Sequence, residues 1–229
     1  MEEQSVPQCV GFIMDGNRRW AKNLGRAPFE GHAEGYQALQ KIIKAVHTAG
    51  IPHMVCYAFS TENWKRATEE VDYLMDLLHR ALGELSEKLK TDKRHINLRV
   101  IGEKEKLSQK LQTEIERIES KNHADPELTV WIAISYGGRA EIVDAVNHAI
   151  AQGQTVTEEA FEAFLWTNGM PDPDLIIRTS GEVRLSNFLL WQSAYSELFF
   201  TDTMWPDFGE SEFRGILEQY GKRKRRIGV

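Results

Sequence analysis

The densest group of residues able to do chemistry directly follows an apolar run at residues 10–14 and comprises Asp15, Gly16, Asn17, Arg18, Arg19 and Trp20. We expect the apolar run to form a buried strand, and Asn17 to cap a helix that begins after it. Free N–H groups at a helix start attract anions, and arginine side chains match phosphate geometry. Asp15 would repel such an anion unless a divalent cation lay between them, so the group predicts a magnesium–diphosphate site. The alternative is a strand–turn–helix with a solvated basic face.

A second polar group follows the next apolar run, at residues 54–59, and comprises Ser60, Thr61, Glu62, Asn63, Trp64 and Arg66. These residue types favour a loop over the interior of a helix or strand. If the two strands are parallel, this loop lies at the same sheet edge as Asp15, where ligands bind in open α/β sheets. The alternative is an ordinary surface loop, which would also be polar.

A third group surrounds Gly181, where Arg178 would end a strand and Arg184 and Ser186 follow the turn. Two guanidiniums and a hydroxyl around a glycine turn predict a second anion pocket. The alternative is that one or both arginines pair with Glu182 or Glu197.

Two isolated residues are also candidates. Glu197 opens an aromatic, strand-like run, and a carboxylate in such a place is usually paired or ligates a metal because burying it alone is costly. His32, in the segment GHAEG, could contact a phosphate or be a hydrogen-bonded structural residue.

The elements that must position these groups alternate in type. Strands are expected at residues 10–14, 54–59, 98–101, 128–135, 174–178 and 197–200. Helices are expected at 36–46, 71–89, 107–118, 140–151, 186–194 and 210–220, with a helix start capped by Thr157 in an otherwise irregular stretch at 153–173. This order predicts an α/β fold with one open, mostly parallel six-stranded sheet and helices on both faces. We expect a single domain over 1–229, with tails at 1–8 and 222–229.

Composition narrows the function classes. The chain has 229 residues and a net charge of −6, which argues against nucleic acid as a partner of the whole molecule. Its two cysteines, Cys9 and Cys56, lie in apolar runs and are expected to be buried thiols in a reducing compartment. The polar start is unlike a signal peptide, and no apolar run is long enough to span a membrane. These features predict a cytoplasmic protein that meets a membrane only peripherally.

Several of these segments together resemble one known family. The segments MDGNRRWA, YAFSTENW, SYGGR, IRTSGE, RLSNFLLWQ and WPDF occur in the order in which cis-prenyltransferases carry them, and the resemblance runs from about Val10 to the C-terminus. It implies transfer of an allylic prenyl group, such as farnesyl, to isopentenyl diphosphate, with Mg²⁺ as cofactor. The product would be a long-chain polyprenyl diphosphate such as undecaprenyl diphosphate, housed in an apolar tunnel.

The resemblance also implies roles for individual residues. Asp15 would be essential and bind Mg²⁺, with Glu197 as a second ligand from the same or a partner subunit. The allylic diphosphate would be held by Gly16, Asn17, Arg18, Arg19, Trp20 and His32, in a site lined by Ser60, Thr61, Glu62, Trp64 and Arg66. Isopentenyl diphosphate would be bound by Arg178, Arg184, Leu185 and Ser186. Asn63 is the family's usual proton acceptor, but an amide is a poor base, so we expect it to orient substrate while a diphosphate oxygen takes the proton. Pro28 stands where the family often has an arginine, so this position does not offer the family's auxiliary phosphate contact.

Product length and assembly complete the expectations. Small Ala58 is similar to the residue of long-chain relatives, and part of the 71–89 helix would line the tunnel. The ending Arg226-Ile227-Gly228 resembles a family tail that reaches the partner's site, which requires a homodimer; WQSAYSELFF and Trp205 are its candidate interface. The alternatives are a non-catalytic partner subunit, a shorter-chain synthase, and a nucleotide-binding domain. The last ranks lowest because the chain lacks both GxxxxGK[ST] and GxGxxG.

Overall fold

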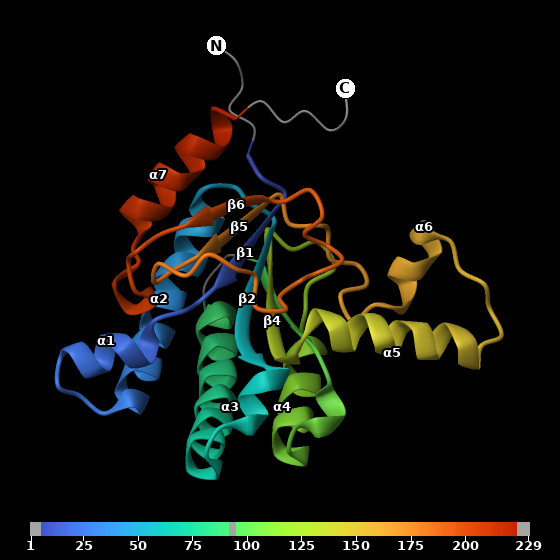
Figure 1. Ribbon diagram of the computed structural model, residues 1–229, viewed down its shortest axis with the longest axis horizontal. Coiled ribbons are helices and arrows are strands. Elements are labelled where there is room, and N and C mark those ends of the chain that lie inside the picture. Colours follow the sequence, from blue (N-terminus) through green and yellow to red (C-terminus); the bar gives the residue numbers. More distant parts are fainter. Residues whose placement is uncertain (1–5, 92–94, 224–229) are drawn as a thin grey trace.

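The computed structural model describes residues 6–91 and 95–223 and has one six-stranded sheet in the order β3-β4-β2-β1-β5-β6 (Figure 1). All five strand pairings are parallel. The strands are β1 (Cys9–Ile13), β2 (His53–Ser60), β3 (Ile96–Ile101), β4 (Leu128–Tyr136), β5 (Leu175–Arg178) and β6 (Glu197–Phe200). The predicted open parallel sheet is therefore confirmed, and the strand ends that carry the polar groups meet at one edge.

Helices connect the strands. They are α1 (Asn17–Asn23), α2 (Pro28–Thr48), α3 (Thr68–Thr91), α4 (Gln109–Glu119), α5 (Gly138–Ala151), α6 (Glu158–Phe161) and α7 (Glu210–Gly221). Short 3-10 turns are η1 (Thr61–Lys65), η2 (Lys104–Lys106), η3 (Glu162–Phe164) and η4 (Trp205–Asp207). Thr157 caps α6 as expected, since its hydroxyl accepts a hydrogen bond from the N–H of Ala160 at 3.3 Å. In the described ranges, no helix has the length and apolar character needed to cross a membrane.

The two faces of the sheet are covered differently. Alternate residues of β1, such as Val10 and Phe12, belong to the larger core with α2, α3, α4, α7 and η4. Cys9 and Ile13 face a smaller core that is closed by residues from 166–170 and 185–189. Helices α5 and α6 lie beyond this second face (Figure 1). Both cysteines are buried and free.

Three sequence expectations are wrong. Residues 186–194 form turns and no helix, because Ser186, Asn187 and Leu189 have positive φ angles of 49°, 67° and 46° that a right-handed helix excludes. Asn17 is the first residue of α1, and Gly16 occupies the N-cap. Trp205 cannot supply a dimer interface because only 1% of it is exposed in the single chain. The predicted RxG tail lies outside the described residues.

Candidate active site

Asp15 directly follows β1, and its backbone is held at both ends. Its N–H donates to the hydroxyl of Thr179 at 3.0 Å, and its carbonyl accepts from Thr179 at 2.7 Å and from the N–H of Trp205 at 3.0 Å. The carboxylate accepts from the N–H of Gly16 at 2.7 Å and from Arg178 Nη2 at 2.9 Å. The carboxylate is therefore fixed in place while 31% of the side chain stays exposed.

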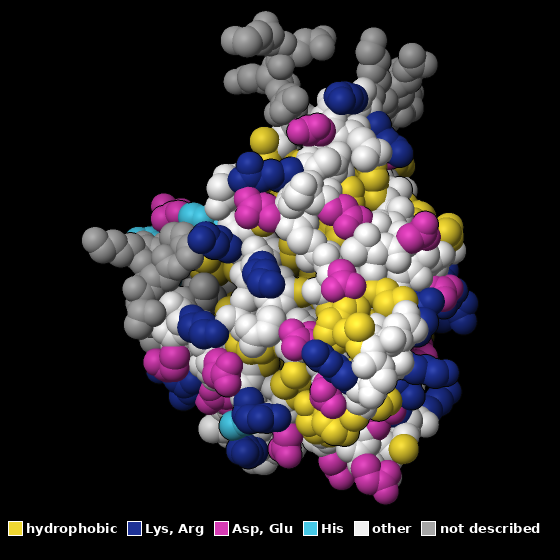
Figure 2. All heavy atoms as spheres, turned by 90° about the vertical axis from the view of Figure 1, so that its left-hand side faces the viewer, with side chains coloured by type: hydrophobic (Ala, Val, Ile, Leu, Met, Phe, Trp, Pro, Cys, Tyr) yellow, Lys and Arg dark blue, Asp and Glu magenta, His cyan; other side chains and the backbone are white. Residues whose placement is uncertain are grey.

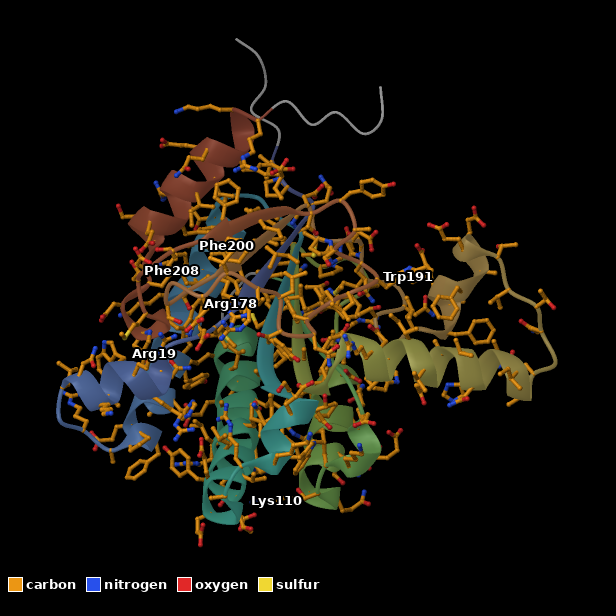
Figure 3. All side chains as sticks on the ribbon, viewed as in Figure 1. Arg19, Lys110, Arg178, Trp191, Phe200 and Phe208 are labelled. Atoms are coloured by element: carbon orange, nitrogen blue, oxygen red, sulfur yellow. The ribbon has the colours of Figure 1, made fainter. Side chains whose placement is uncertain are left out.

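Gly16 makes the tight turn from β1 into α1. Its φ of 103° is one that only glycine adopts readily, and a Cβ here would lie 2.9 Å from Cβ of Ser180. The turn brings Arg19 to the site, where Nη2 donates to the hydroxyl of Ser180 at 2.5 Å and lies 3.8 Å from Asp15. Figure 3 shows Arg19 and Arg178 in the same region of the molecule, one on α1 and one at the end of β5.

Two glycines of α2 bring His32 against α1, and the sequence analysis did not anticipate their role. A Cβ on Gly31 would lie 2.0 Å from the carbonyl oxygen of Asn17, and one on Gly35 would lie 2.4 Å from Asn17 Oδ1. Asn17 Oδ1 and His32 Nε2 are both buried without a hydrogen-bond partner in the described part of the chain. Such atoms are expected where a polar ligand completes the site.

A pocket of about 560 Å³ lies between these groups and is strongly cationic. Its lining includes Asp15, Gly16, Asn17, His32 and the cations Arg18, Arg19, Lys22, Arg26 and Arg66. Burial, with help from Arg66 and Arg18, lowers the pKa of His32 to about 4, so its imidazole is neutral near pH 7. Pro28 lines the pocket too, in place of the family's arginine, and Arg26 lies 5.5 Å over the ring of Trp20. Trp20 is thus placed as a platform for a pocket cation.

The second polar group forms η1 at the end of β2. Asn63 Oδ1 accepts from the N–H of Ser60 at 3.1 Å, which leaves the amide NH₂ as the group able to meet a substrate. Glu62 accepts from Asn187 at 3.0 Å; burial alone would raise the pKa of Glu62, but hydrogen bonds from its own N–H, Asn187, Ser60 and Thr61 together lower it. Arg66 pairs with Glu70 at 2.9 Å.

Trp64 and Thr61 pack inward and do not line the cationic pocket. The indole N–H of Trp64 donates to the hydroxyl of Ser135 at 2.9 Å, and its ring lies 5.0 Å from that of Phe59. Thr61 packs against Gly137, where a Cβ would approach its hydroxyl to 2.6 Å. Both residues position the loop in the single chain.

Arg178 joins the first and third groups. Only 4% of its side chain is exposed, and beside Asp15 it donates to the carbonyl of Arg184 at 2.6 Å and to the hydroxyl of Ser186 at 2.7 Å. Arg184 is more than half exposed and pairs with Glu182 at 2.5 Å, as the ion-pair alternative anticipated for one of the two arginines. Leu185 packs against the smaller core. The second anion pocket is therefore no separate unit, because a buried guanidinium couples it to Asp15.

A fully buried carboxylate anchors this loop from behind, and the sequence pattern did not reveal it. Glu141 accepts from Tyr136 at 2.5 Å, from the N–H and hydroxyl of Thr167 at 3.0 and 2.9 Å, and from Gln192 at 3.0 Å. Burial and this carboxylate raise the pKa of Tyr136 well above its ordinary value. The network ties the ends of β4 and of the 185–192 loop together.

Glu197 lies away from Asp15 within one chain. It is the first residue of β6 and pairs in register with Leu175, whereas Arg178 at the carboxyl end of β5 pairs with Phe200. Its carboxylate accepts a hydrogen bond from Arg223. The described residues hold no cluster of three or more His, Cys, Asp or Glu side chains suited to a metal. A metal site that uses both carboxylates would therefore need a second chain.

An apolar slot adjoins the cationic pocket between α2, α3 and the sheet. Met14, Asn17 and His32 line both cavities, and the slot continues along side chains that include Ala58, Leu78 and Leu82. Figure 2 looks onto the side of the molecule that carries α1 and α2 and shows hydrophobic side chains gathered among charged ones. A cationic pocket that opens into an apolar slot suits an amphiphile with an anionic head and a hydrocarbon tail.

Comparisons with known proteins agree with this geometry. A family model described as "Putative undecaprenyl diphosphate synthase" matches residues 13–228. An isoprenyl transferase from Fusobacterium nucleatum subsp. nucleatum is 47% identical over 227 residues, which cover 99% of this chain and 97% of that protein. A tritrans,polycis-undecaprenyl-diphosphate synthase (geranylgeranyl-diphosphate specific) from Picrophilus torridus is 41% identical. The alignment covers 100% of this chain and 92% of that protein.

A solved structure is similar over nearly the whole fold. Lavandulyl diphosphate synthase from Lavandula x intermedia, in complex with dimethylallyl diphosphate, superimposes with a TM-score of 0.92 at 36% identity, covering 97% of this chain and 98% of that one. The resemblance drawn from the motifs is confirmed. The chain belongs to the undecaprenyl diphosphate synthase family and is an enzyme that transfers prenyl groups.

Proposed function

We propose that the enzyme condenses isopentenyl diphosphate onto an allylic diphosphate, with farnesyl diphosphate as primer and undecaprenyl diphosphate as the product. One observation carries this proposal: the cationic pocket of about 560 Å³ beside Asp15 opens directly into an apolar slot. The diphosphate would lie in the pocket and the prenyl chain in the slot. Two of the similar proteins are associated with other allylic diphosphates. The Picrophilus torridus synthase is geranylgeranyl-diphosphate specific, and the lavandulyl diphosphate synthase structure contains dimethylallyl diphosphate.

Mg²⁺ fits the donor set around Asp15. A protein usually binds this ion through one or two carboxylates together with substrate phosphates. Asp15 offers a fixed, partly exposed carboxylate at the mouth of a pocket whose other charged groups are cations. When bound there, Mg²⁺ would supply positive charge that stabilises a departing diphosphate.

The side chains of the pocket act on the same leaving group. Cleavage of the allylic C–O bond would place negative charge on the diphosphate. Arg18, Arg19 and Arg66, which line the pocket, would neutralise it. An Nε2–H of His32 is a suitable donor to a phosphate oxygen, because this buried atom has no partner in the described ranges. The isopentenyl double bond then attacks the allylic carbon, and a proton is lost from the adduct.

Asn63 and the Arg184 loop would hold the second substrate. Because Asn63 Oδ1 already accepts from Ser60, its NH₂ orients substrate and a diphosphate oxygen takes the proton. Arg184 and Ser186 would bind the diphosphate of isopentenyl diphosphate, with Arg178 fixing their positions.

A homodimer would complete the site. Val143, Val146 and Ile150 form an exposed apolar stripe on α5, and Tyr195 and Leu198 are exposed on and beside edge strand β6. Contiguous exposed apolar residues favour a protein interface. A partner docked there would bring Glu197 toward the other chain's Asp15 as the second metal ligand. Mixing an Asp15→Ala chain with a Glu197→Ala chain should then restore activity, because each heterodimer holds one intact site.

The decisive test of the reaction is incubation with farnesyl diphosphate, labelled isopentenyl diphosphate and Mg²⁺, followed by mass analysis of the products. Incorporated label in products of about eleven units is expected. No incorporation, together with a larger thermal shift by ATP than by Mg²⁺ and farnesyl diphosphate, would overturn the proposal in favour of nucleotide binding.

We place the enzyme in the cytoplasm, with no nucleic acid partner. Because the proposed product is a lipid, we also expect peripheral membrane contact when the product is released.

A further inference from the structure

The turn from α1 into α2 presents two large apolar side chains to solvent. Leu24, just after α1, is 55% exposed, and Phe29, in the first turn of α2, is 50% exposed. This corner projects from the side of the molecule (Figure 1). Between the two residues, Gly25 has a left-handed φ of 68°, and a Cβ on it would meet nothing within 4 Å. The corner is therefore open to an external partner.

The same segment is basic, although the whole chain has a net charge of −6. Residues 16–29 include Arg18, Arg19, Lys22 and Arg26 and no carboxylate. The three arginines lie 3.3–3.7 Å from carboxylates of other segments, yet their side chains remain 46–53% exposed. Lys22 is exposed and forms no ion pair with any residue that the structure describes. Exposed ion pairs of this kind are weak, so the cations stay available to an anionic surface.

The corner adjoins both cavities of the candidate active site. Lys22 and Arg26 line the cationic pocket. The ring of Phe29 lies 5.3 Å from that of Tyr73 on α3. Leu77 follows Tyr73 by one helical turn, lies on the same face of α3 and lines the apolar slot. The exposed apolar surface thus continues along the α2–α3 contact toward the slot.

We propose that this corner is the surface by which the enzyme docks on a membrane that contains anionic lipids. Exposed apolar side chains flanked by Lys and Arg are typical of surfaces that insert into the headgroup region of a bilayer. The centre of a protein interface is instead depleted of charged residues. The inference rests on the proposed function, because a lipid product that leaves the pocket and the slot here would pass directly into the bilayer.

Co-sedimentation of the full chain with lipid vesicles, in the absence of substrate, tests this surface. We expect wild type to bind vesicles of phosphatidylcholine with phosphatidylglycerol more tightly than vesicles of phosphatidylcholine alone, and added salt to remove this preference. Leu24→Ser and Phe29→Ser should each lower the partition coefficient by about fivefold, because each removes a half-exposed apolar side chain that lipid would bury. Phe29→Trp keeps an aromatic ring suited to the membrane interface and should retain binding.

Val6 provides a matched control. It is 48% exposed, but it precedes β1 and so lies at the opposite end of that strand from α1. Val6→Ser should therefore leave vesicle binding unchanged. The Leu24→Ser/Phe29→Ser double variant should lose more binding than either single variant, and the single variants keep the test decisive if the double variant does not fold.

Three results would overturn the proposal: wild-type vesicle binding in folded Leu24→Ser and Phe29→Ser, an equal loss in Val6→Ser, or equal binding of wild type to neutral and anionic vesicles. A change in the sedimentation velocity of the double variant without vesicles, with vesicle binding unchanged, would overturn it in favour of a protein interface. All of these results leave prenyl transfer standing. Failure of the proposed function would appear instead as missing label in the incorporation assay.

Discussion

The cationic pocket and the apolar slot meet at His32, yet they are built in opposite ways. The pocket has about 560 Å³ of free volume. The backbone of Asp15 is held by hydrogen bonds with Thr179 and Trp205, and its carboxylate is fixed by Gly16 and Arg178. The slot has about 90 Å³ and is enclosed mainly by side chains of α2, α3 and the sheet. One region is ready for its ligand, whereas the other must adapt to it.

This difference suggests a division of labour. Stabilising a diphosphate as it departs requires charges that do not reorganise during the reaction, so the pocket benefits from rigid support. A growing hydrocarbon chain needs only apolar volume, which side-chain movements can provide. Substitutions in the pocket should therefore change rate and affinity, and substitutions in the slot should change product length.

The largest effect is expected for Asp15→Ala. Removing the only pocket carboxylate among the lining residues takes away the candidate Mg²⁺ ligand, and we expect the rate to fall by about a thousandfold, a loss typical of charge-stabilising groups. The variant leaves the buried Arg178 guanidinium without its carboxylate partner, so the free energy of unfolding should fall. The chain should still fold, because the backbone contacts of Asp15 do not involve the lost carboxylate. Turnover with Mg²⁺ and circular dichroism provide the measurement. A folded variant with near wild-type turnover would contradict the assignment.

Arg178 and Arg184 should separate support from substrate binding. Buried Arg178 holds Asp15 and Ser186 together, so Arg178→Ala should lower the free energy of unfolding by about 3–5 kcal/mol and weaken the binding of both substrates. Arg184 is exposed, so Arg184→Ala should leave stability unchanged. It should weaken only the binding of isopentenyl diphosphate, by on the order of 1.5–3 kcal/mol. Urea unfolding and the two KM values test this. Loss of primer affinity alone in Arg184→Ala would reverse the assignment.

Sequence reasoning predicted the sheet well because its signals are local. Apolar runs such as residues 54–59 end at turn formers. Apolar residues at helical spacing likewise predicted α3 and α7. The site residues around Asp15 were identified for the same reason, since carboxylate, glycine and arginines are adjacent in the chain. The grouping of three motifs at one sheet edge follows directly from parallel strands.

Apart from the one-residue error at the N-cap of α1, the failures depend on contacts between distant residues. Residues 186–194 are apolar enough for a helix. Instead, the side chain of Asn187 donates to Glu62 and accepts from the N–H of Arg139, and the backbone at Asn187 is left-handed. In the sequence, Glu141 resembles any polar residue of an amphipathic helix. Only the structure shows that Thr167 and Gln192 surround it. The coupling of Arg178 to Asp15 spans 163 residues and leaves no local pattern.

His32 provides a test at the boundary of the two regions. The pKa of His32 is about 4 in the folded chain, against an ordinary value of 6.5. Between these two pH values the unfolded state binds more protons than the folded state, so stability rises with pH. The contribution of His32 to the free energy of unfolding is fully present above pH 6.5, and about 3 kcal/mol is lost as the pH falls to 4 and below. Urea unfolding of His32→Gln should therefore show a shallower loss of stability between pH 7 and pH 4 than wild type. A His32→Gln curve parallel to wild type would contradict the lowering of the His32 pKa by burial.

The smallest energetic effect, and the most specific one, is expected for Ala58→Leu. Ala58 lines the slot on the β2 side, opposite the helices, and is only partly buried. A leucine there adds three carbons to a cavity of about 90 Å³ without touching the charged pocket. We expect the main product to be shorter while the first condensation proceeds at nearly the wild-type rate, as measured by single-turnover incorporation and mass analysis. If the rate of the first condensation fell instead and product length stayed unchanged, slot and pocket would not be separable, and the adaptable hydrocarbon wall would have to be sought away from β2.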